Sequence, residues 1–180
     1  MKHCSSCGAR VSVKIPPGDN RERSVCDDCG TIHYVNPKMV AGCIPVWGER
    51  ILLCRRAIEP RYGMWTLPAG FMENGETTAA AAVRETLEEA NARVEVDSLF
   101  ALINIPYINQ VYLFYRAKLL GEEYSPGHES LEVELVSESQ VPWDSIAFPA
   151  VTKTLKWYFA DREAGVFETH TGDIMYRPSR

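Results

Sequence analysis

Residues 70–92 read GFMENGETTAAAAVRETLEEANA, and the rest of the chain is interpreted around this stretch. Gly70 and Gly75 bracket a turn, after which Thr77 or Thr78 can cap a helix that contains four consecutive alanines. Spacing along that helix predicts an apolar face toward the core and a carboxylate face on the opposite, outward side. The apolar set is Ala79, Val83, Leu87 and Ala90, and the carboxylates are Glu85, Glu88 and Glu89.

These three carboxylates favour a bound cation. Glutamates three and four residues apart on a helix repel one another by a few tenths of a kcal/mol per pair unless a positive group lies among them. Ligands that are all carboxylate oxygens suit Mg²⁺ or Mn²⁺, and Mg²⁺ usually keeps water and phosphate oxygens in its other positions. The cluster therefore indicates phosphate chemistry. The alternative is a solvated acidic face on which Arg84 pairs with Glu88.

Six residues of the stretch have the spacing G-x5-E-x7-R-E-x-x-E-E, which resembles the Nudix box; they are Gly70, Glu76, Arg84, Glu85, Glu88 and Glu89. In that family the box forms a loop–helix–loop that binds divalent metal and supports hydrolysis of a diphosphate linked to a further group. The resemblance implies that the three helix glutamates ligate the metal near the backbone of Gly70, with Glu88 and Arg84 in the catalytic set. It also implies that Glu76 and Arg84 hold the loop and the helix together.

Two positions depart from the family pattern. The family prefers an aliphatic residue where Thr86 stands and a glycine where Asn91 stands. Asparagine is the next best residue after glycine for the left-handed conformation that ends a helix. We therefore expect the helix to stop at Asn91.

Composition is that of a soluble globular protein. The chain has 180 residues, of which 46% are hydrophobic and 24% charged, and this argues against disorder. The net charge of -5 argues against a general nucleic-acid binder, which normally has a basic excess. There is no apolar run of about 18 residues, and the N-terminal MKHCSSCGAR lacks the apolar core of a signal peptide. We expect a cytoplasmic protein with no membrane partner.

Two Cys-x-x-Cys-Gly motifs lie near the N-terminus. They contain Cys4 and Cys7, then Cys26 and Cys29 after a gap of eighteen residues. This spacing is typical of two tight turns that close a tetrahedral thiolate site, with a glycine in positive φ after each pair. Four cysteines leave no open coordination position, so we expect a structural Zn²⁺. Dithiol redox chemistry is the alternative, although two matched pairs favour metal, and the segment resembles a zinc ribbon.

Beyond Asn36-Pro37, apolar patterning predicts strands, the box helix, further strands and a closing helix. The helix opens at Pro149 and buries a stripe made of Val151, Leu155, Tyr158 and Phe159. This order predicts a mixed α/β (α+β) fold, and the resemblance implies a mixed sheet between helices, an α/β/α sandwich. The predicted domains are a zinc ribbon at 1–36, a Nudix domain at 37–160, and a tail or oligomer contact at 161–180.

Candidate substrate-binding residues lie on either side of the box. Arg55, Arg56 and Arg61 precede it, where a guanidinium can clamp a diphosphate bidentately, and the alternative for each is a solvated surface arginine. Tyr107 or Phe148 can stack on a nucleobase, with a core position as the alternative for either.

Glu129 is the candidate base that takes the proton of the attacking water. Residues 128–136, HESLEVELV, resemble the loop and strand that carry an additional metal-site glutamate in the zinc-containing NADH pyrophosphatases, and Glu129 falls on that position. Glu132 is the alternative base. A solvated acidic loop is the alternative explanation for both residues.

The resemblance also bears on the substrate. NADH pyrophosphatases join a ribbon to a Nudix domain, but they carry SQPWPFPxS soon after the box, where this chain has IPYINQVYLFY. A proline fifteen residues past the last box position is associated in the family with ADP-ribose hydrolysis, and Pro106 stands fifteen residues after Asn91. We therefore predict hydrolysis of a small nucleotide, ADP-ribose ahead of FAD and NADH, with release of AMP.

A function of a different class is a binding protein. Its ribbon would engage nucleic acid or a protein partner, and its Nudix domain would only sense a nucleotide. The intact box and the acidic charge balance argue against this reading. Homodimers are common in the family, so the resemblance allows a homodimer.

Overall fold

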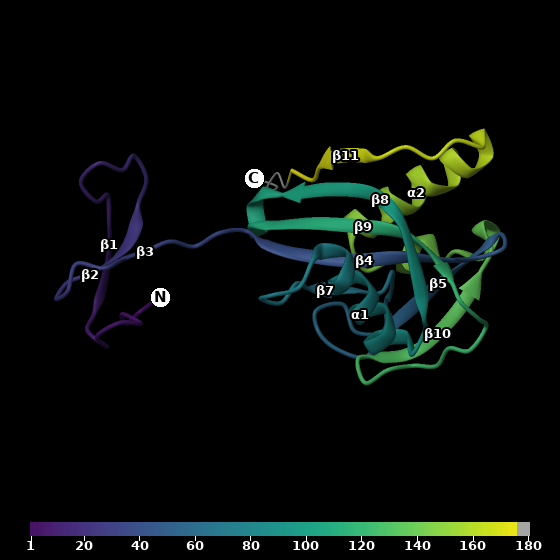
Figure 1. The fold of residues 1–180 in the computed structure, drawn as a ribbon, viewed down its shortest axis with the longest axis horizontal. Coiled ribbons are helices and arrows are strands. Elements are labelled where there is room, and N and C mark those ends of the chain that lie inside the picture. The colour runs from purple at the N-terminus through teal and green to yellow at the C-terminus, as the bar shows by residue number, and fades with distance from the viewer. Residues whose placement is uncertain (176–180) are drawn as a thin grey trace. The chain divides into compact units, whose positions relative to one another are not determined.

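The structure, a computed structural model, describes residues 1–175. The chain divides into two compact units, Met1–Pro37 and a second unit that begins at Lys38 (Figure 1). Each unit is built on its own hydrogen-bonded sheet. Within residues 1–175, no helix combines the length and the apolar character that a membrane crossing requires.

The first unit is a small antiparallel sheet next to two cysteine turns. Its strands are β1 (Val11–Lys14), β2 (Arg23–Cys26) and β3 (Ile32–His33), in the order β1-β2-β3. Gly8 and Gly30 have φ values of 77° and 70°, so each Cys-x-x-Cys turn ends in the left-handed conformation that glycine adopts without steric cost. This confirms the turn conformation predicted from the two motifs.

The second unit is built on a mixed sheet. Its strands are β4 (Lys38–Trp47), β5 (Arg50–Arg56), β6 (Trp65–Thr66), β7 (Ala69–Phe71), β8 (Val94–Ile105), β9 (Gln110–Leu119), β10 (Ser130–Val136) and β11 (His170–Asp173). The main path is β10-β5-β4-β9-β8-β11, while β6 pairs with β5 and β7 with β4. Strand β4 is parallel to β9 and β11 is parallel to β8. Short 3-10 turns lie at Pro106–Ile108, Glu138–Gln140 and Trp143–Ser145.

Helices α1 (Thr78–Ala90) and α2 (Pro149–Ala164) cover opposite faces of this sheet (Figure 1). Neighbouring residues of the central strands belong to different cores, because successive side chains of a strand point to opposite faces. Ile44 and Leu53 pack in the core that includes α2, whereas Cys43 and Leu52 pack in the core that includes α1. The predicted mixed α/β fold with a sheet between helices is confirmed.

Strand β7 and the preceding Pro68 lie unusually close to strand β4 at Gly42. Gly42 pairs with Ala69, and a Cβ atom on Gly42 would lie 2.4 Å from both the Ala69 Cβ and the Pro68 carbonyl oxygen. The neighbouring Ala41 and Cys43 are small and fully buried, and the Cys43 thiol lies 3.4 Å from the Ala82 carbonyl oxygen of α1. Small side chains therefore let β7 and α1 pack tightly against β4.

Helix α1 begins and ends where the sequence predicts. The Thr77 hydroxyl accepts a hydrogen bond from the Ala80 N–H at 3.1 Å, and Asn91 ends the helix with φ 47°. Thr86 is fully buried, and its hydroxyl donates to the Ala82 carbonyl at 2.8 Å, which satisfies the one polar group that an aliphatic residue would lack.

The predicted orientation of α1 about its axis is wrong. Ala90 is buried as expected, but Leu87 is 47% exposed, and Glu85 and Glu89 are buried. The face that packs on the sheet consists of small side chains, and it includes Ala81, Ala82, Thr86 and Ala90. That face allows the closer approach to β4, so dispersion contacts favour it over one centred on the bulkier Leu87, while Val83 packs half-buried at its edge. Two of the carboxylates consequently lie against β7 instead of projecting outward.

Helix α2 agrees with its prediction and continues into the segment that we expected to be a tail. Its predicted stripe is buried, namely Val151, Leu155, Tyr158 and Phe159. After the helix ends at Gly165, strand β11 pairs with β8, and the Asn104 amide donates to the Asp173 carboxylate at 2.9 Å. Residues 161–175 are therefore part of the fold and not a separate tail. The remainder of that prediction, 176–180, lies outside the described residues.

Candidate functional site

A cavity of about 1230 Å³ opens beside helix α1. Its lining contains an acidic group with one arginine, made of Glu73, Glu85, Glu88, Glu89, Glu129 and Arg84. It also contains an aromatic and aliphatic group, which includes Ile105, Tyr107, Tyr112, Phe114, Phe148 and Val151. One cavity thus combines acidic oxygens with a surface suited to a flat apolar ligand.

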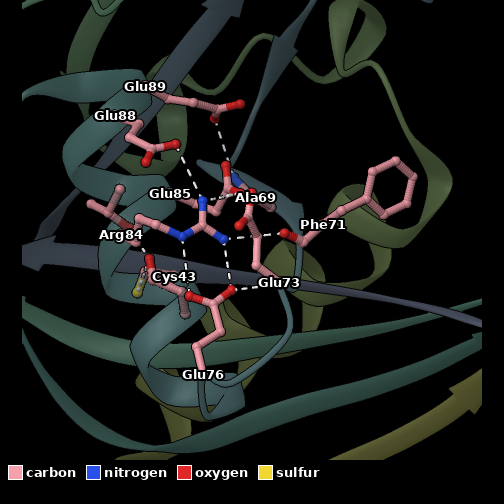
Figure 2. A network of polar contacts seen from close by, with 11 residues as sticks. Cys43, Ala69, Phe71, Glu73, Glu76, Arg84, Glu85, Glu88 and Glu89 are labelled. Atoms are coloured by element: carbon pink, nitrogen blue, oxygen red, sulfur yellow. Dashed lines mark hydrogen bonds and ion pairs between the residues drawn. The ribbon is translucent and has the colours of Figure 1, made fainter.

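Arg84 lies at the centre of the acidic group (Figure 2). Its guanidinium donates to the Glu76 carboxylate at 2.8 and 3.1 Å, to Glu85 at 2.7 Å, to Glu88 at 3.2 Å and to the Phe71 carbonyl at 3.1 Å. The hydrogen bond from Arg84 holds the pKa of Glu76 below its usual range. Because these partners lie on the helix, on β7 and in the turn between them, Arg84 ties the three segments together.

Glu85 and Glu89 are carboxylates in unusually buried positions. Glu89 is 7% exposed, and its carboxylate accepts a hydrogen bond from the Ala69 N–H at 3.2 Å. Burial raises the pKa of Glu89 to about 8, and the nearby charges of Glu85 and Glu129 act in the same direction. Burial also raises the pKa of Glu85, although hydrogen bonding from Arg84 opposes it. For both carboxylates, the nearby positive charge and hydrogen bonds stabilise the ionised form less than burial destabilises it.

Gly70 makes room for one of these carboxylates. It lies in β7 opposite Ala41, and a Cβ atom on it would lie 2.3 Å from a Glu85 carboxylate oxygen. We predicted Gly70 as a turn residue whose backbone approaches the metal. The structure places it within a strand and not in a turn, and the missing Cβ leaves the space that the Glu85 side chain occupies. The approach of its backbone to a metal stays a prediction.

Glu129 enters the same cavity from a loop that follows β9. The loop is fixed to the end of α1, where the Gly127 N–H donates to the Glu89 carbonyl at 3.0 Å, and its far end is fixed to the chain after β5, where the Ala57 N–H donates to the Glu129 carbonyl at 2.8 Å. The structure thus brings Glu129 together with the helix carboxylates. Glu132, the alternative, lies on β10 and pairs with Arg55 at 2.9 Å.

Of the three predicted arginines, Arg56 is the one that lines the cavity among the described residues. Its guanidinium lies 5.1 Å from the centre of the Phe148 ring, and its Nε donates to the Pro60 carbonyl at 2.9 Å. Its charge also lowers the pKa values of Glu89 and Tyr112 against the larger effect of burial. Arg56 therefore lies within electrostatic reach of both the acidic and the aromatic groups.

The other predicted substrate-binding residues fall into two groups, those that line the cavity and those that do not. Tyr107 and Phe148 line the cavity, as does Tyr112, which the sequence did not single out because its strand pattern reads as scaffold. Arg55 neighbours Arg56 on β5, so its side chain points to the opposite face of the strand, where it pairs with Glu132. Arg61 lies in the loop after β5 with φ 70°, and it is not among the residues that line the cavity.

The acidic group carries the oxygen donors that a hard divalent cation prefers. Among the described residues, however, only the four cysteines have ligand atoms that all lie within 4.8 Å of one another, so the glutamate oxygens are less closely gathered than the sulfurs. Its donors are carboxylate oxygens, two of them on buried side chains whose raised pKa values show a shortage of positive charge. A divalent ion supplies that charge, and oxygen ligands of this kind suit Mg²⁺ or Mn²⁺. The residues that surround such an ion would be Glu85, Glu88 and Glu89.

The cysteines of the first unit form a closed sulfur cluster. Each offers an Sγ atom within 4.8 Å of the others, with Cys4–Cys29 at 3.7 Å and Cys7–Cys26 at 3.4 Å. A tetrahedron with Zn–S bonds of about 2.3 Å has edges of about 3.8 Å, so these separations suit Zn²⁺. Without a metal the four thiols differ: the Ser6 N–H lowers the pKa of the Cys4 thiol to about 5, whereas the Cys26 and Cys29 sulfurs raise the pKa of the Cys7 thiol to about 12. The evidence for zinc is therefore the spacing of the sulfur atoms.

Two side chains beside the cluster were not predicted. The His33 Nε2 lies 3.3 Å from the Cys4 sulfur, and the Thr31 hydroxyl lies 3.0 Å from the Cys29 sulfur. Both follow the second cysteine pair closely in the chain, and nothing in their spacing distinguishes them from ordinary strand residues. They add hydrogen bonds to sulfur outside the four ligands.

Comparison with known proteins agrees with both units. Residues 36–158 match the family described as NUDIX domain, and residues 2–35 match the family described as Nudix N-terminal, a zinc ribbon. This chain belongs to the Nudix hydrolase family. A crystal structure of a NUDIX hydrolase from Nitrosomonas europaea is 53% identical, covers 97% of this chain and 99% of that chain, and has a TM-score of 0.94.

The curated relatives of this chain include proteins with two different functional names. The NAD-capped RNA hydrolase NudC of Pseudomonas aeruginosa is 27% identical over 135 residues, which cover 73% of this chain and 45% of that protein. The ADP-ribose pyrophosphatase of Methanocaldococcus jannaschii is 29% identical over 113 residues, which cover 61% of this chain and 67% of that protein. The chain thus spans about half the length of the NudC proteins that it matches. The cytoplasmic location and the homodimer stay predictions.

Proposed function

We propose that this Nudix protein hydrolyses the diphosphate of a nucleoside diphosphate linked to a further group, with ADP-ribose as the first candidate and AMP as a product. The observation that carries the proposal is one cavity that is lined by buried carboxylates, by aromatic rings and by Arg56. The positive charge of Arg56 acts on a residue of each group, Glu89 and Tyr112. A diphosphate attached to a flat base has the matching chemistry, since it carries negative charge beside a stacking surface.

Glu85, Glu88 and Glu89 would hold Mg²⁺ or Mn²⁺, with Gly70 leaving space for the Glu85 side chain. When bound, the cation supplies positive charge to the phosphate oxygens and eases ionisation of the attacking water. Glu129 accepts the proton of that water at its carboxylate, as a general base held by its loop. Arg84 acts as a positioning residue, because its guanidinium fixes Glu85 and Glu88.

Arg56 is the residue that we assign to the diphosphate. Its planar guanidinium can donate two parallel hydrogen bonds to phosphate oxygens, and it lies over the Phe148 ring. Phe148 and Tyr107 then provide faces on which adenine can stack. The predicted substrate order is ADP-ribose, then FAD and NADH, and the relationship to an ADP-ribose pyrophosphatase supports ADP-ribose as the first candidate.

A second candidate is an NAD-linked substrate, including NAD-capped RNA. The relationship to NudC proteins over 135 residues favours it. ADP-ribose and NAD share the adenosine diphosphate half, so the same Arg56 and aromatic contacts serve both. The net charge of -5 weakens the case for a long nucleic-acid partner.

A substrate panel tests the proposal. Turnover of ADP-ribose, FAD, NADH, an NAD-capped oligonucleotide and a nucleoside triphosphate is measured with Mg²⁺ and with Mn²⁺, and AMP is identified among the products. Glu88→Gln should lower kcat at least about a hundredfold with little change in Tm, because Glu88 is exposed and its main partner is Arg84. Efficient cleavage of the triphosphate alone, without AMP from any dinucleotide, would overturn the proposal.

A matched pair of arginine variants tests the diphosphate contact. Arg56→Lys keeps the charge but loses the planar fork, so it should raise KM about tenfold or more. Arg61→Lys is the control, since this side chain lies outside the cavity lining. Equal KM values for the two variants would remove Arg56 from the substrate site. A ribbon-only binding function predicts no turnover on any substrate and is excluded by a positive result.

A further inference from the structure

Asn91 occupies the position at which the Nudix box ends, and its side chain makes contacts that glycine cannot make. The residue ends α1 with φ 47°. Its Nδ2 lies 3.2 Å from the Ser125 carbonyl, 3.1 Å from the Ser125 hydroxyl and 3.2 Å from the Pro126 carbonyl. The amide therefore shares its two N–H groups among three oxygens of one loop. A glycine would end the helix equally well, so the end of the helix alone does not explain these contacts.

The same loop is joined to the helix through its backbone. The Ser125 N–H donates to the Ala90 carbonyl at 2.9 Å, and the Gly127 N–H donates to the Glu89 carbonyl at 3.0 Å. These bonds satisfy two carbonyl groups that the end of a helix otherwise leaves without a partner. Gly127 lies so close that a Cβ atom on it would be 1.8 Å from the Glu88 carbonyl oxygen. The loop and the last turn of α1 are thus packed as one piece.

Glu129 follows two residues after Gly127, on the far side of this attachment. Its backbone carbonyl accepts from the Ala57 N–H at 2.8 Å, so the short segment that carries it is fixed at both ends. The Glu129 charge acts on Glu85 and Glu89, in addition to the larger effect of their burial, to raise their pKa values. Any movement of the loop away from α1 therefore changes the distance between Glu129 and the helix carboxylates.

We propose that Asn91 is a positioning residue, whose side-chain amide clamps residues 125–127 to the end of α1 and so fixes the Glu129 carboxylate beside Glu85 and Glu89. The proposal rests on the proposed function for the role of Glu129 in turnover. The clamp itself is a property of the protein before any substrate binds, and it is measured separately.

Two substitutions at Asn91 and one at Gly127 separate a clamp from a helix cap. Glycine tolerates the left-handed conformation better than asparagine, and alanine tolerates it poorly. If Asn91 only caps the helix, Asn91→Gly should equal the wild type in stability and activity, and Asn91→Ala should be worse. If Asn91 is a clamp, Asn91→Gly should also lower kcat, by about tenfold to a hundredfold, with KM changed less than about twofold. Gly127→Ala should give the same kinetic loss with Asn91 intact, since its Cβ displaces the loop from the other side.

Two readouts distinguish failure of the clamp from failure of the proposed function. Hydrogen exchange of the Ser125 and Gly127 amides, measured without substrate, should accelerate about tenfold or more in Asn91→Gly. In a Glu129→Gln background, Asn91→Gly should lower kcat no further, because the group that it positions is already removed. Unchanged exchange in Asn91→Gly overturns the clamp. Accelerated exchange with unchanged kcat overturns the positioning role.

If the wild type cleaves none of the panel substrates, the proposed function fails while the clamp is still read from exchange and from Mn²⁺ binding. Electron paramagnetic resonance of Mn²⁺ should then show weaker binding to Asn91→Gly than to wild type, since the negative charge of Glu129 would no longer be held where it acts on Glu85 and Glu89 and would add less to the attraction of the cation. Equal Mn²⁺ affinity in the two proteins would overturn the positioning of Glu129.

Discussion

Burial of Glu89 should make the stability of the protein without Mg²⁺ or Mn²⁺ fall as pH rises. Burial raises its pKa to about 8 from an ordinary value of 4.5. The unfolded chain releases the proton near the ordinary value, whereas the folded protein retains it until about pH 8, so folding becomes less favourable through that window. Below the window both states are protonated and the penalty is absent. Above it both states are ionised and the penalty is constant.

The size of the effect follows from the pKa change. Each pH unit inside the window lowers the free energy of unfolding by about 1.4 kcal/mol, which gives about 3 kcal/mol between pH 5 and pH 7.5. Urea unfolding at several pH values measures it, in buffer that contains trace zinc but no Mg²⁺ or Mn²⁺. Glu89→Gln is the matched control, because its amide keeps an acceptor for the Ala69 N–H and does not titrate.

The difference between the wild-type and Glu89→Gln curves isolates this one group from the histidines and other carboxylates. Parallel curves for the two proteins would refute the reasoning, since they would mean that Glu89 titrates normally in the folded state. Addition of Mg²⁺ should flatten the wild-type curve by favouring the ionised carboxylate, and an unchanged slope with saturating Mg²⁺ would remove Glu89 from the metal site.

Three further predictions concern the rest of the site and the ribbon. Gly70→Ala should raise the Mn²⁺ concentration for half-maximal activity about tenfold, because its Cβ occupies the space of the Glu85 carboxylate; Gly121→Ala, with its nearest neighbour at 3.9 Å, should not. Arg84→Lys should lower the free energy of unfolding by about 1–2 kcal/mol in urea titrations, since the three donors of lysine lie at one atom and cannot reproduce the planar two-point contact with Glu76 while also reaching Phe71 and Glu88; an unchanged midpoint would contradict the network. Removal of zinc should collapse the NMR dispersion of residues 1–37 and leave that of the second unit unchanged; loss of dispersion throughout would show that the units are not separate.

The elements of this fold were predictable because they depend on local chemistry. The cap at Thr77, the stop at Asn91 and the glycine-ended cysteine turns each follow from the conformational preference of one residue. The rotation of α1 was not predictable in this way. Helical spacing offers both a larger aliphatic face and a smaller alanine-rich face, and the choice depends on the small residues of β4, which lie far away in the sequence.

The site shows the same division. The spacing of the box glutamates places them together on one helix, but spacing could not tell which of three arginines enters the cavity. Arg55 and Arg56 are adjacent on β5, so they point to opposite faces, and it is the cavity that Arg56 shares with the glutamates of α1 that identifies the face of the site. The contacts of Asn91 likewise depend on a loop more than thirty residues downstream.

The tight approach of β7 to β4 has a consequence for how the central strands keep their alignment. A strand with one polar face resists a one-residue slip because the slip would bury polar side chains, but β4 is apolar on both faces and lacks that safeguard. In β4 the close contacts at Gly42 prevent such a slip sterically. A slip in either direction would bring Ala41 or Cys43 to the place where even a methyl group collides with Pro68 and Ala69. Steric contact with the segment of Pro68 and β7, and not the cost of burying polar side chains, therefore keeps β4 in register.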